Sequence, residues 1–378
     1  MLRDALPFNA AVDAFHARLA GEGDFAARLG AAARFIEREC AEFAGDAMAP
    51  LRAHWLRTLD EVHSLAPDGS AAALASALQG TDARLTDVTL SPGERLRLLE
   101  RAQVIRHLAL RAHSVEAAAI PRIVHLVKTD SANHDLPLIP FLCYRSVLAH
   151  CRGYRVVLHT PVQPAGPRWE QLLPHLELDI RMPPQNIGAH RLHLAAHQSD
   201  VWRVQTLIRD GGFYFDWDLL LLRSPDPLRR HVCVMALEEQ VPGYREVLGV
   251  SAIGAQPGSV FLQCWLNGMP GAFDPAQYVA HSTVLAREIA LQVPTMLRVL
   301  PWETFYFPGW TEAAMRWLFD PALRCDEAAL QRTLASTTGI HLFASHGHFL
   351  RWAESFTEDD IRGRRCNLAM LLQPLLPP

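Results

Sequence analysis

Two carboxylates lie two positions apart at the end of an aromatic run. Asp216 and Asp218 follow GGFYF and precede four leucines within SDVWRVQTLIRDGGFYFDWDLLLLRSPDPL, residues 199–228. Two carboxylates held this close repel one another and lose hydration, unless a cation or a bound proton compensates. Mg²⁺ or Mn²⁺ would do so, because hard divalent ions prefer oxygen ligands, including the phosphates of a substrate. The pair indicates metal-assisted chemistry on a phosphorylated substrate, with a solvated turn between strand and loop as the alternative.

A helix is predicted directly before this pair. Ser199 is a good helix N-cap, Asp200 follows in the first turn, where the helix dipole favours negative charge, and Gly211-Gly212 supplies the stop. Asp200 and Arg203, three residues apart, then lie on neighbouring faces of the helix. We expect them to form either an ion pair or part of a binding site.

A strand is predicted over GFYFDWD, which leads into and contains the two aspartates. Side chains alternate across a strand, so Tyr214, Asp216 and Asp218 are expected on one side, with Phe215 and Trp217 on the other. The two carboxylates would then project together from the end of the strand.

The remainder of the chain divides into two regions of different texture. Residues 1–117 are rich in Ala, Leu, Arg and Glu with apolar residues at helical spacing, as in FAARLGAAARFIERECAEFAG, and predict a helical bundle of four or five members. IPRIVHLV is then typical of a buried strand, FLCYRSVLAHCRG of a helix, and YRVVLHT of a second strand. This alternation favours an α/β domain over residues 118–378, with a parallel sheet of the nucleotide-binding type. The sequence contains no GxGxxG or GxxxxGKS/T phosphate loop.

Composition excludes several classes of protein. The chain of 378 residues is 49% hydrophobic and 20% charged, which suits about two folded domains of a typical ~150 residues each. A net charge of −4 offers no basic surplus for nucleic acid or an anionic membrane. The seven cysteines form no CxxC pair, and no apolar run reaches the ~18 residues of a membrane helix. We expect a soluble, cytoplasmic protein without a signal peptide, and secretion by a route that needs no signal stays open.

The central stretch resembles a known family. SDxxR, the GG stop, the aromatic strand, DxD and SPDPL together are similar to glycosyltransferase family 32 and its relatives, DXD-type sugar transferases related to the initiating mannosyltransferases and the glucosylating toxins. IPRIVHLV resembles the family's opening strand, GVSAIGAQPGSVFL its apolar run and Pro-Gly turn, LPWETFYFPG its late Phe-Tyr-Pro strand, and GIHLFASHG its closing histidine strand. The resemblance covers about residues 119–350. It implies an A-type glycosyltransferase fold, which is a Rossmann-like mixed sheet flanked by helices.

The resemblance also implies how a nucleotide sugar is held. Asp200 and Arg203 would hydrogen-bond the hydroxyls of the donor sugar. Asp216 would contact the ribose and the sugar, and His125 would line the base pocket.

A metal site is implied in the same way, with Mn²⁺ or Mg²⁺ as the cofactor. Asp218 would bind the metal directly, and His341 matches the C-terminal ligand of the metal or diphosphate, with Ser345 and His346 as alternates. Asp216 and Asp218 are accordingly the expected catalytic residues.

The function that follows is metal-dependent transfer of a hexose from a nucleoside diphosphate sugar, and the resemblance implies retention at the anomeric carbon. UDP-glucose, UDP-galactose, UDP-GlcNAc and GDP-mannose all fit, and the acceptor is open among a glycan, a lipid-linked sugar, a metabolite and a protein. One alternative is an inactive nucleotide-sugar-binding protein that uses its helical bundle for interactions. A metal-dependent phosphohydrolase is a further alternative, although the sequence shows no additional Asp/Glu/His cluster for two-metal chemistry.

Overall fold

The structure is a computed structural model of the chain. It describes separate residues between 11 and 19 and between 94 and 108, together with the continuous ranges 23–39, 49–85, 119–132, 134–238, 246–292 and 296–377. Within these ranges, no helix combines the length and apolar character that crossing a membrane requires.

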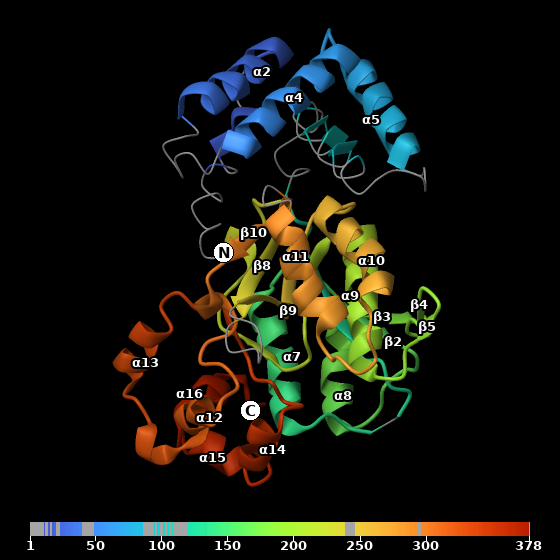
Figure 1. Cartoon of the computed structure of the whole chain (residues 1–378). Coiled ribbons are helices and arrows are strands. Elements are labelled where there is room, and N and C mark those ends of the chain that lie inside the picture. Colours follow the sequence, from blue (N-terminus) through green and yellow to red (C-terminus); the bar gives the residue numbers. More distant parts are fainter. Residues whose placement is uncertain are drawn as a thin grey trace.

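The described part of the N-terminal region is helical, as its sequence predicts. Its continuously described helices are α2 (Phe25–Arg34), which runs on into a π-helical turn (Phe35–Glu39), α4 (Ala49–Leu65) and α5 (Ala71–Leu85). Their apolar faces form a core of their own, drawn in Figure 1 as a separate group of helices. The predicted boundary near residue 117 lies outside the described residues, so the division into domains 1–117 and 118–378 stays a prediction.

A seven-stranded mixed sheet forms the centre of the second region, which confirms the predicted α/β class. Its strand order is β10-β8-β9-β6-β1-β2-β3, with β9 antiparallel to both of its neighbours and the other pairs parallel. The strands are β1 (Ile123–Val127), β2 (Arg155–Thr160), β3 (Glu177–Ile180), β6 (Gly212–Phe215), β8 (Cys233–Glu238), β9 (Val247–Ala255) and β10 (Arg298–Leu300). A two-stranded hairpin, β4 (Asn186–Ile187) and β5 (His190–Arg191), lies outside this sheet.

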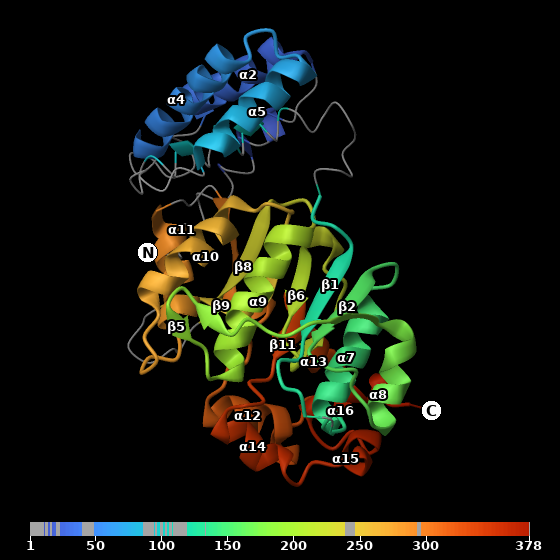
Figure 2. The same ribbon diagram turned by 90° about the vertical axis from the view of Figure 1, so that its right-hand side faces the viewer.

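Helices cover both faces of the sheet, as Figures 1 and 2 show. The first face carries α7 (Leu138–His150) and α8 (Pro167–Leu172), and the second carries α9 (Ala195–Asp210), α10 (Val260–Ala272) and α11 (Leu285–Gln292). Side chains of one strand alternate between the two cores, since Phe213 and Phe215 pack on the α7 side and Tyr214 on the α9 side. The predicted strand, helix and strand over residues 120–160 are confirmed as β1, α7 and β2, and β1 pairs with β2 in parallel.

The C-terminal part extends the α7 face. Its helices are α12 (Glu312–Phe319), α13 (Glu327–Thr333), α14 (Gly347–Ala353), α15 (Glu358–Arg362) and α16 (Asn367–Leu372). Apolar residues of this part join the core beneath β1 and α7. The predicted Phe-Tyr-Pro strand is wrong, because residues 302–304 form a 3₁₀-helix and the residues after it form a turn.

The helix before the aspartates begins earlier than predicted. α9 starts at Ala195 with Leu194 at its N-cap, so Ser199 lies inside the helix and Asp200 in its second turn. The hydroxyl of Ser199 contacts the Tyr214 hydroxyl and the Arg203 guanidinium instead of capping the helix. The predicted stop is confirmed, since Gly211 ends the helix with φ of 65°, a conformation that glycine adopts without strain.

The strand into the aspartates ends earlier than predicted. β6 stops at Phe215, and a turn over residues 216–218 leads to β7 (Leu219–Leu221), which leaves the main sheet and pairs with β11 (Gly339–His341). Alternation therefore fails beyond Phe215. Trp217 was expected opposite the two aspartates, but it borders the same cavity as they do.

Candidate active site

A cavity of about 480 Å³ lies at the carboxyl ends of the parallel strands. It is bordered by residues after β1, by the first half of α9, by Tyr214 in β6 and the turn 216–218, by the end of β8 and by the loop after β11. Ligands of open α/β sheets bind at this edge, because the strands end there and their loops diverge.

Three side chains of metal-ligating type converge in the cavity wall. Asp216, Asp218 and His341 each direct one ligand atom to a common point, and these atoms all lie within 4.8 Å of one another. Nε2 of His341 is 3.3 Å from Oδ1 of Asp218 and 3.8 Å from Oδ2 of Asp216. The pairing of β7 with β11 explains this convergence, because it sets His341 opposite Leu219, the residue that follows Asp218.

The loop after β11 orients Asp218. The backbone N–H of Ala344 donates a hydrogen bond of 2.6 Å to Oδ2 of Asp218, which leaves Oδ1 facing His341. Phe343 adopts φ of 52° in this loop, a left-handed conformation that is strained for a bulky residue. Strain of this kind is concentrated at functional sites, and here it accompanies the turn that places the Ala344 amide at the carboxylate.

Charges in the cavity wall shift the pKa values of Asp218 and His341 in opposite directions. Burial disfavours the charged form of Asp218, but His341 and the Ala344 amide outweigh it and lower the pKa of Asp218. Burial likewise opposes the imidazolium of His341, but Asp218 and Asp216 raise its pKa above the ordinary value. The cluster thus attracts positive charge.

The donor set fits a divalent metal. Two carboxylates and one imidazole are ligands that Mn²⁺ accepts, and both Oδ1 of Asp218 and Nε2 of His341 face the common point. Nδ1 of His341 has no hydrogen-bond partner among the described residues, so its tautomer is not imposed by the described part of the fold. A divalent metal bound at this cluster would take the place of a proton on His341.

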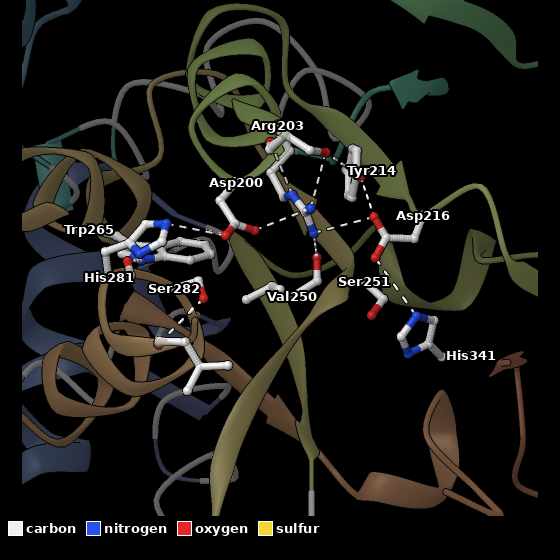
Figure 3. A network of polar contacts seen from close by, with 12 residues as sticks. Asp200, Arg203, Tyr214, Asp216, Val250, Ser251, Trp265, His281, Ser282 and His341 are labelled. Carbon is white, nitrogen blue, oxygen red and sulfur yellow. Dashed lines mark hydrogen bonds and ion pairs between the residues drawn. The ribbon is translucent and has the colours of Figure 1, made fainter. Parts of the chain in front are cut away.

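Arg203 connects the two ends of the site, as Figure 3 shows. Its guanidinium donates hydrogen bonds to the carbonyl of Val250 at 2.7 Å and to the carbonyl of Ser199 at 3.2 Å. It also lies 3.2 Å from Oδ1 of Asp200 and 3.4 Å from Oδ1 of Asp216. Burial opposes its charge, but Asp216 raises the pKa of Arg203 above its ordinary value, so it remains a cation.

Asp216 is oriented by Tyr214 in β6 and by the neighbouring strand β9. Its backbone N–H donates to the carbonyl of Ser251 in β9 at 2.8 Å, and its Oδ1 accepts a hydrogen bond from the hydroxyl of Tyr214. Tyr214 stands two residues earlier on the same side of β6, as the alternation predicts. Asp216 therefore presents its free oxygen, Oδ2, towards His341.

His125 is buried and is not among the residues that line the cavity, so its predicted place in the base pocket has no support in this cavity. One ring nitrogen is 2.8 Å from the carbonyl oxygen of Gly211 and the other is 3.0 Å from Nε2 of His159, whose Nδ1 in turn contacts Asp179 at 2.7 Å. Burial and the neighbouring His159 lower the pKa of His125 to about 4. One nitrogen is engaged by Gly211 at the end of α9 and the other by His159 in β2, so His125 is a structural residue.

The two alternates of His341 differ in position. Ser345 lines the cavity, whereas His346 caps the N-terminus of α14 and its ring lies against Trp310. The structure thus brings together Asp200, Arg203, Asp216, Asp218, His341 and Ser345, and leaves His125 and His346 outside.

Glu238, which the sequence did not mark as a site residue, ends β8 and lines the cavity. Burial raises the pKa of Glu238 to about 7, with His341 opposing and Asp216 adding to the shift. A partly desolvated carboxyl group in a cavity is a candidate for contact with a ligand. No local signal marked it, because CVMALE is typical of an ordinary buried strand.

Two exposed aromatic residues also border the cavity. Tyr278 is 57% exposed and Trp217 is 37% exposed, and both border the cavity. Exposed aromatic rings beside a polar cavity provide flat apolar surface to a ligand.

Comparison with known sequences confirms the resemblance seen in the motif. Residues 142–235 match the family described as a glycosyltransferase sugar-binding region containing a DXD motif. The matched segment includes Asp200, Arg203, Asp216 and Asp218 and ends before His341. Residues 142–235 of this chain are thus similar to a glycosyltransferase sugar-binding region.

A curated relative is similar over part of the chain. Glucan organizing enzyme 1 of Cryptococcus neoformans var. grubii serotype A is 28% identical over 202 residues, which are 50% of this chain and 55% of that protein. This chain therefore spans about half the length of that relative.

Two solved structures of glycosyltransferases share weak similarity with this chain. PaToxG glycosyltransferase has 10% identity and a TM-score of 0.34, with 80% of this chain and 96% of that chain covered. The galactosyltransferase LgtC, in complex with donor and acceptor sugar analogs, has 12% identity and a TM-score of 0.33, with 64% and 99% covered.

Proposed function

We propose that this protein is a metal-dependent hexosyltransferase that moves a sugar from a nucleoside diphosphate sugar to a hydroxyl group, with retention at the anomeric carbon. One observation carries the proposal. Asp216, Asp218 and His341 converge in a cavity that Asp200 and Arg203 also line, within a chain whose residues 142–235 match a glycosyltransferase sugar-binding region.

The metal end of the cavity suits a diphosphate. A divalent ion held by Asp216, Asp218 and His341 would supply positive charge against a departing diphosphate. The protein's own contribution is orientation, because the Ala344 amide holds Asp218 and the Tyr214 hydroxyl holds Asp216. We assign the metal to Mn²⁺ or Mg²⁺.

The sugar end of the cavity suits an uncharged hexose. The Asp200 carboxylate borders the cavity on the far side of Arg203 from the metal cluster, and the carboxylates of Asp216 and Glu238 line the same cavity. Carboxylates accept hydrogen bonds from hydroxyls but repel an acidic sugar. UDP-glucose, UDP-galactose, UDP-GlcNAc and GDP-mannose therefore remain the donors to test, and UDP-glucuronate is the matched acidic control.

The acceptor is proposed to approach beside Trp217 and Tyr278, whose rings border the cavity. The curated relative is named for glucan, so glucan oligosaccharides belong among the acceptors to test. Retention is tested by the anomeric proton signal of the product in NMR; an inverted product would refute that part of the proposal.

The test of function is release of UDP or GDP from the donor panel, with and without Mn²⁺, by wild type and Asp218→Ala. Metal-dependent release from one neutral donor, lost in the variant, is the expected result. Tight metal-dependent binding of a nucleotide sugar with no transfer to water or to any acceptor would favour the inactive binding protein. Hydrolysis of simple phosphate esters instead would favour the phosphohydrolase, and no nucleotide-sugar binding at all would refute the proposal.

A further inference from the structure

A buried histidine contacts Asp200 from behind the cavity wall. His281 is fully buried and is not among the residues that line the cavity, and its Nε2 lies 3.3 Å from Oδ2 of Asp200. The other oxygen, Oδ1, lies 3.2 Å from Nη2 of Arg203. Figure 3 shows the carboxylate between these two partners, which come from different elements of the chain.

The backbone around His281 has an unusual conformation. Residues Ala280–Val284 form a π-helix, η7, in which the N–H of Val284 donates to the carbonyl of Val279 at 3.2 Å. Short π-helical turns are rare and occur frequently at functional sites, because the extra residue re-aims the side chains around it. Here Val279 and Ser282 line the cavity, while His281 lies against Asp200.

The position of the imidazole is fixed by its surroundings. The indole N–H of Trp265 donates to the carbonyl of His281 at 3.0 Å, and the rings of Phe273 and His197 pack on the imidazole with centroids 5.1 Å and 4.8 Å away. Neither ring nitrogen has an aligned hydrogen-bond partner among the described residues. A buried polar ring without such partners costs free energy, so its contact with the Asp200 carboxylate is the interaction that accounts for a histidine here.

We propose that His281 is a positioning residue for the donor sugar, which holds the Asp200 carboxylate in the orientation that accepts hydrogen bonds from sugar hydroxyls. The inference rests on the proposed function. Asp200 belongs to the sugar end of the cavity, so the effect of His281 is confined to the sugar and leaves the nucleotide unaffected. A residue needed only for folding would alter both.

The experiment compares binding of a nucleotide sugar and of its bare nucleotide, each with Mn²⁺, by isothermal titration calorimetry. UDP-glucose with UDP and GDP-mannose with GDP are the probes. Wild type is expected to bind one nucleotide sugar more tightly than its nucleotide. His281→Phe keeps an aromatic ring but loses the contact with Asp200, so it should bind that nucleotide sugar about tenfold more weakly, with nucleotide affinity within about twofold of wild type.

Two polar variants give a matched pair that does not depend on how well His281→Phe folds. The side-chain amide of glutamine reaches the place of the imidazole Nε2, whereas that of asparagine reaches only the place of Nδ1. His281→Gln should therefore retain the preference for the nucleotide sugar, and His281→Asn should lose it. His197→Phe is the control, because His197 packs in the same ring cluster and forms no ion pair with Asp200 among the described contacts; it should bind both ligands as wild type does.

The outcomes separate the inference from the proposed function. Wild type that binds no nucleotide sugar refutes the proposed function and the inference with it. Wild type that prefers the nucleotide sugar, together with a His281→Asn variant of unchanged preference, refutes the inference alone. Equal weakening of nucleotide and nucleotide sugar in the His281 variants, or a loss in His281→Gln as large as in His281→Asn, assigns His281 to packing and also refutes it.

Discussion

Removing Arg203 should destabilise the fold strongly, in a way that depends on pH. Arg203→Met keeps most of the side-chain volume but removes the cation between two carboxylates. The side chains of Arg203, Asp200 and Asp216 are 5%, 8% and 19% exposed, so the pairs are largely desolvated. Breaking a buried pair by removing one partner costs about 3–5 kcal/mol, a large part of a typical total stability of about 5–15 kcal/mol.

The pH dependence follows from the carboxylates of Asp200 and Asp216, which the variant leaves without their shared guanidinium. Without the Arg203 cation, burial disfavours the ionised form of a carboxylate, because less charge compensates for the lost hydration. Carboxylates of this kind destabilise the folded state when they are ionised. The loss of unfolding free energy therefore shrinks as pH falls and the carboxylates bind protons. The deficit of Arg203→Met should therefore be largest at pH 8 and smaller at pH 5.

Urea unfolding followed by tryptophan fluorescence measures the difference at both pH values. Arg155→Met is the matched control, because Arg155 pairs with Glu177 on the surface with side chains that are 61% and 55% exposed. Such exposed pairs contribute about 0–1 kcal/mol. A loss in Arg203→Met no larger than that of Arg155→Met, or one that grows as pH falls, would refute the reasoning.

Three further predictions concern His125, His341 and Glu238. Burial and His159 lower the folded pKa of His125 from 6.5 to about 4. Its contribution to the free energy of unfolding is therefore complete above pH 6.5 and is lost as pH falls through 4. The loss amounts to roughly 3 kcal/mol, at ~1.4 kcal/mol per pKa unit. Urea unfolding between pH 8 and 4 should show a smaller fall in His125→Gln, and an equal fall would contradict this account. His341→Ala should bind Mn²⁺ at least about tenfold more weakly by calorimetry, whereas His346→Ala should bind it as wild type does; the reverse order would disprove the metal assignment. Because the folded pKa of Glu238 is raised to about 7, its ionised form destabilises the fold. Glu238→Gln should therefore be more stable than wild type at pH 8 by at least ~1 kcal/mol. The stabilities of the two proteins should converge by pH 5. A Glu238→Gln variant less stable than wild type at pH 8 would show that the carboxylate has a stabilising partner.

Local patterns predicted the elements around the aspartates better than the ends of those elements. The helix before them was correct in type, and its end at Gly211 was correct because that residue requires a positive φ. Its start was placed at Ser199 from capping preference, but the true start is at Ala195. Tertiary contacts explain the difference, since the Ser199 hydroxyl contacts Tyr214 and Arg203 within the fold.

The same limit applies to the strand. Alternation predicts the faces of Tyr214 and Phe215 correctly, because these residues lie within the ladder of the sheet. It fails at Trp217, because β6 ends at Phe215 and β7 pairs elsewhere, with β11. A period of two has no meaning once the chain leaves the sheet.

The sequence by itself determined the class of the fold over residues 120–160, the pair Asp216 and Asp218, and the resemblance to sugar transferases that the family match confirms. These features depend on neighbours within about thirty residues, whose spacing is visible in one dimension. His341 was proposed from resemblance, and only the pairing of β11 with β7 brings it to Asp218.

Tertiary structure alone decided which further groups act at the site. The amide of Ala344 reaches Asp218 across 126 residues of chain, and His281 reaches Asp200 from a π-helix that no local pattern marked. Glu238 became a cavity residue only because β8 runs parallel to β6 through the intervening strand β9, so that both end at the same edge. Their partners are chosen by strand order and strand register, which depend on the packing of the whole sheet rather than on the residues beside them.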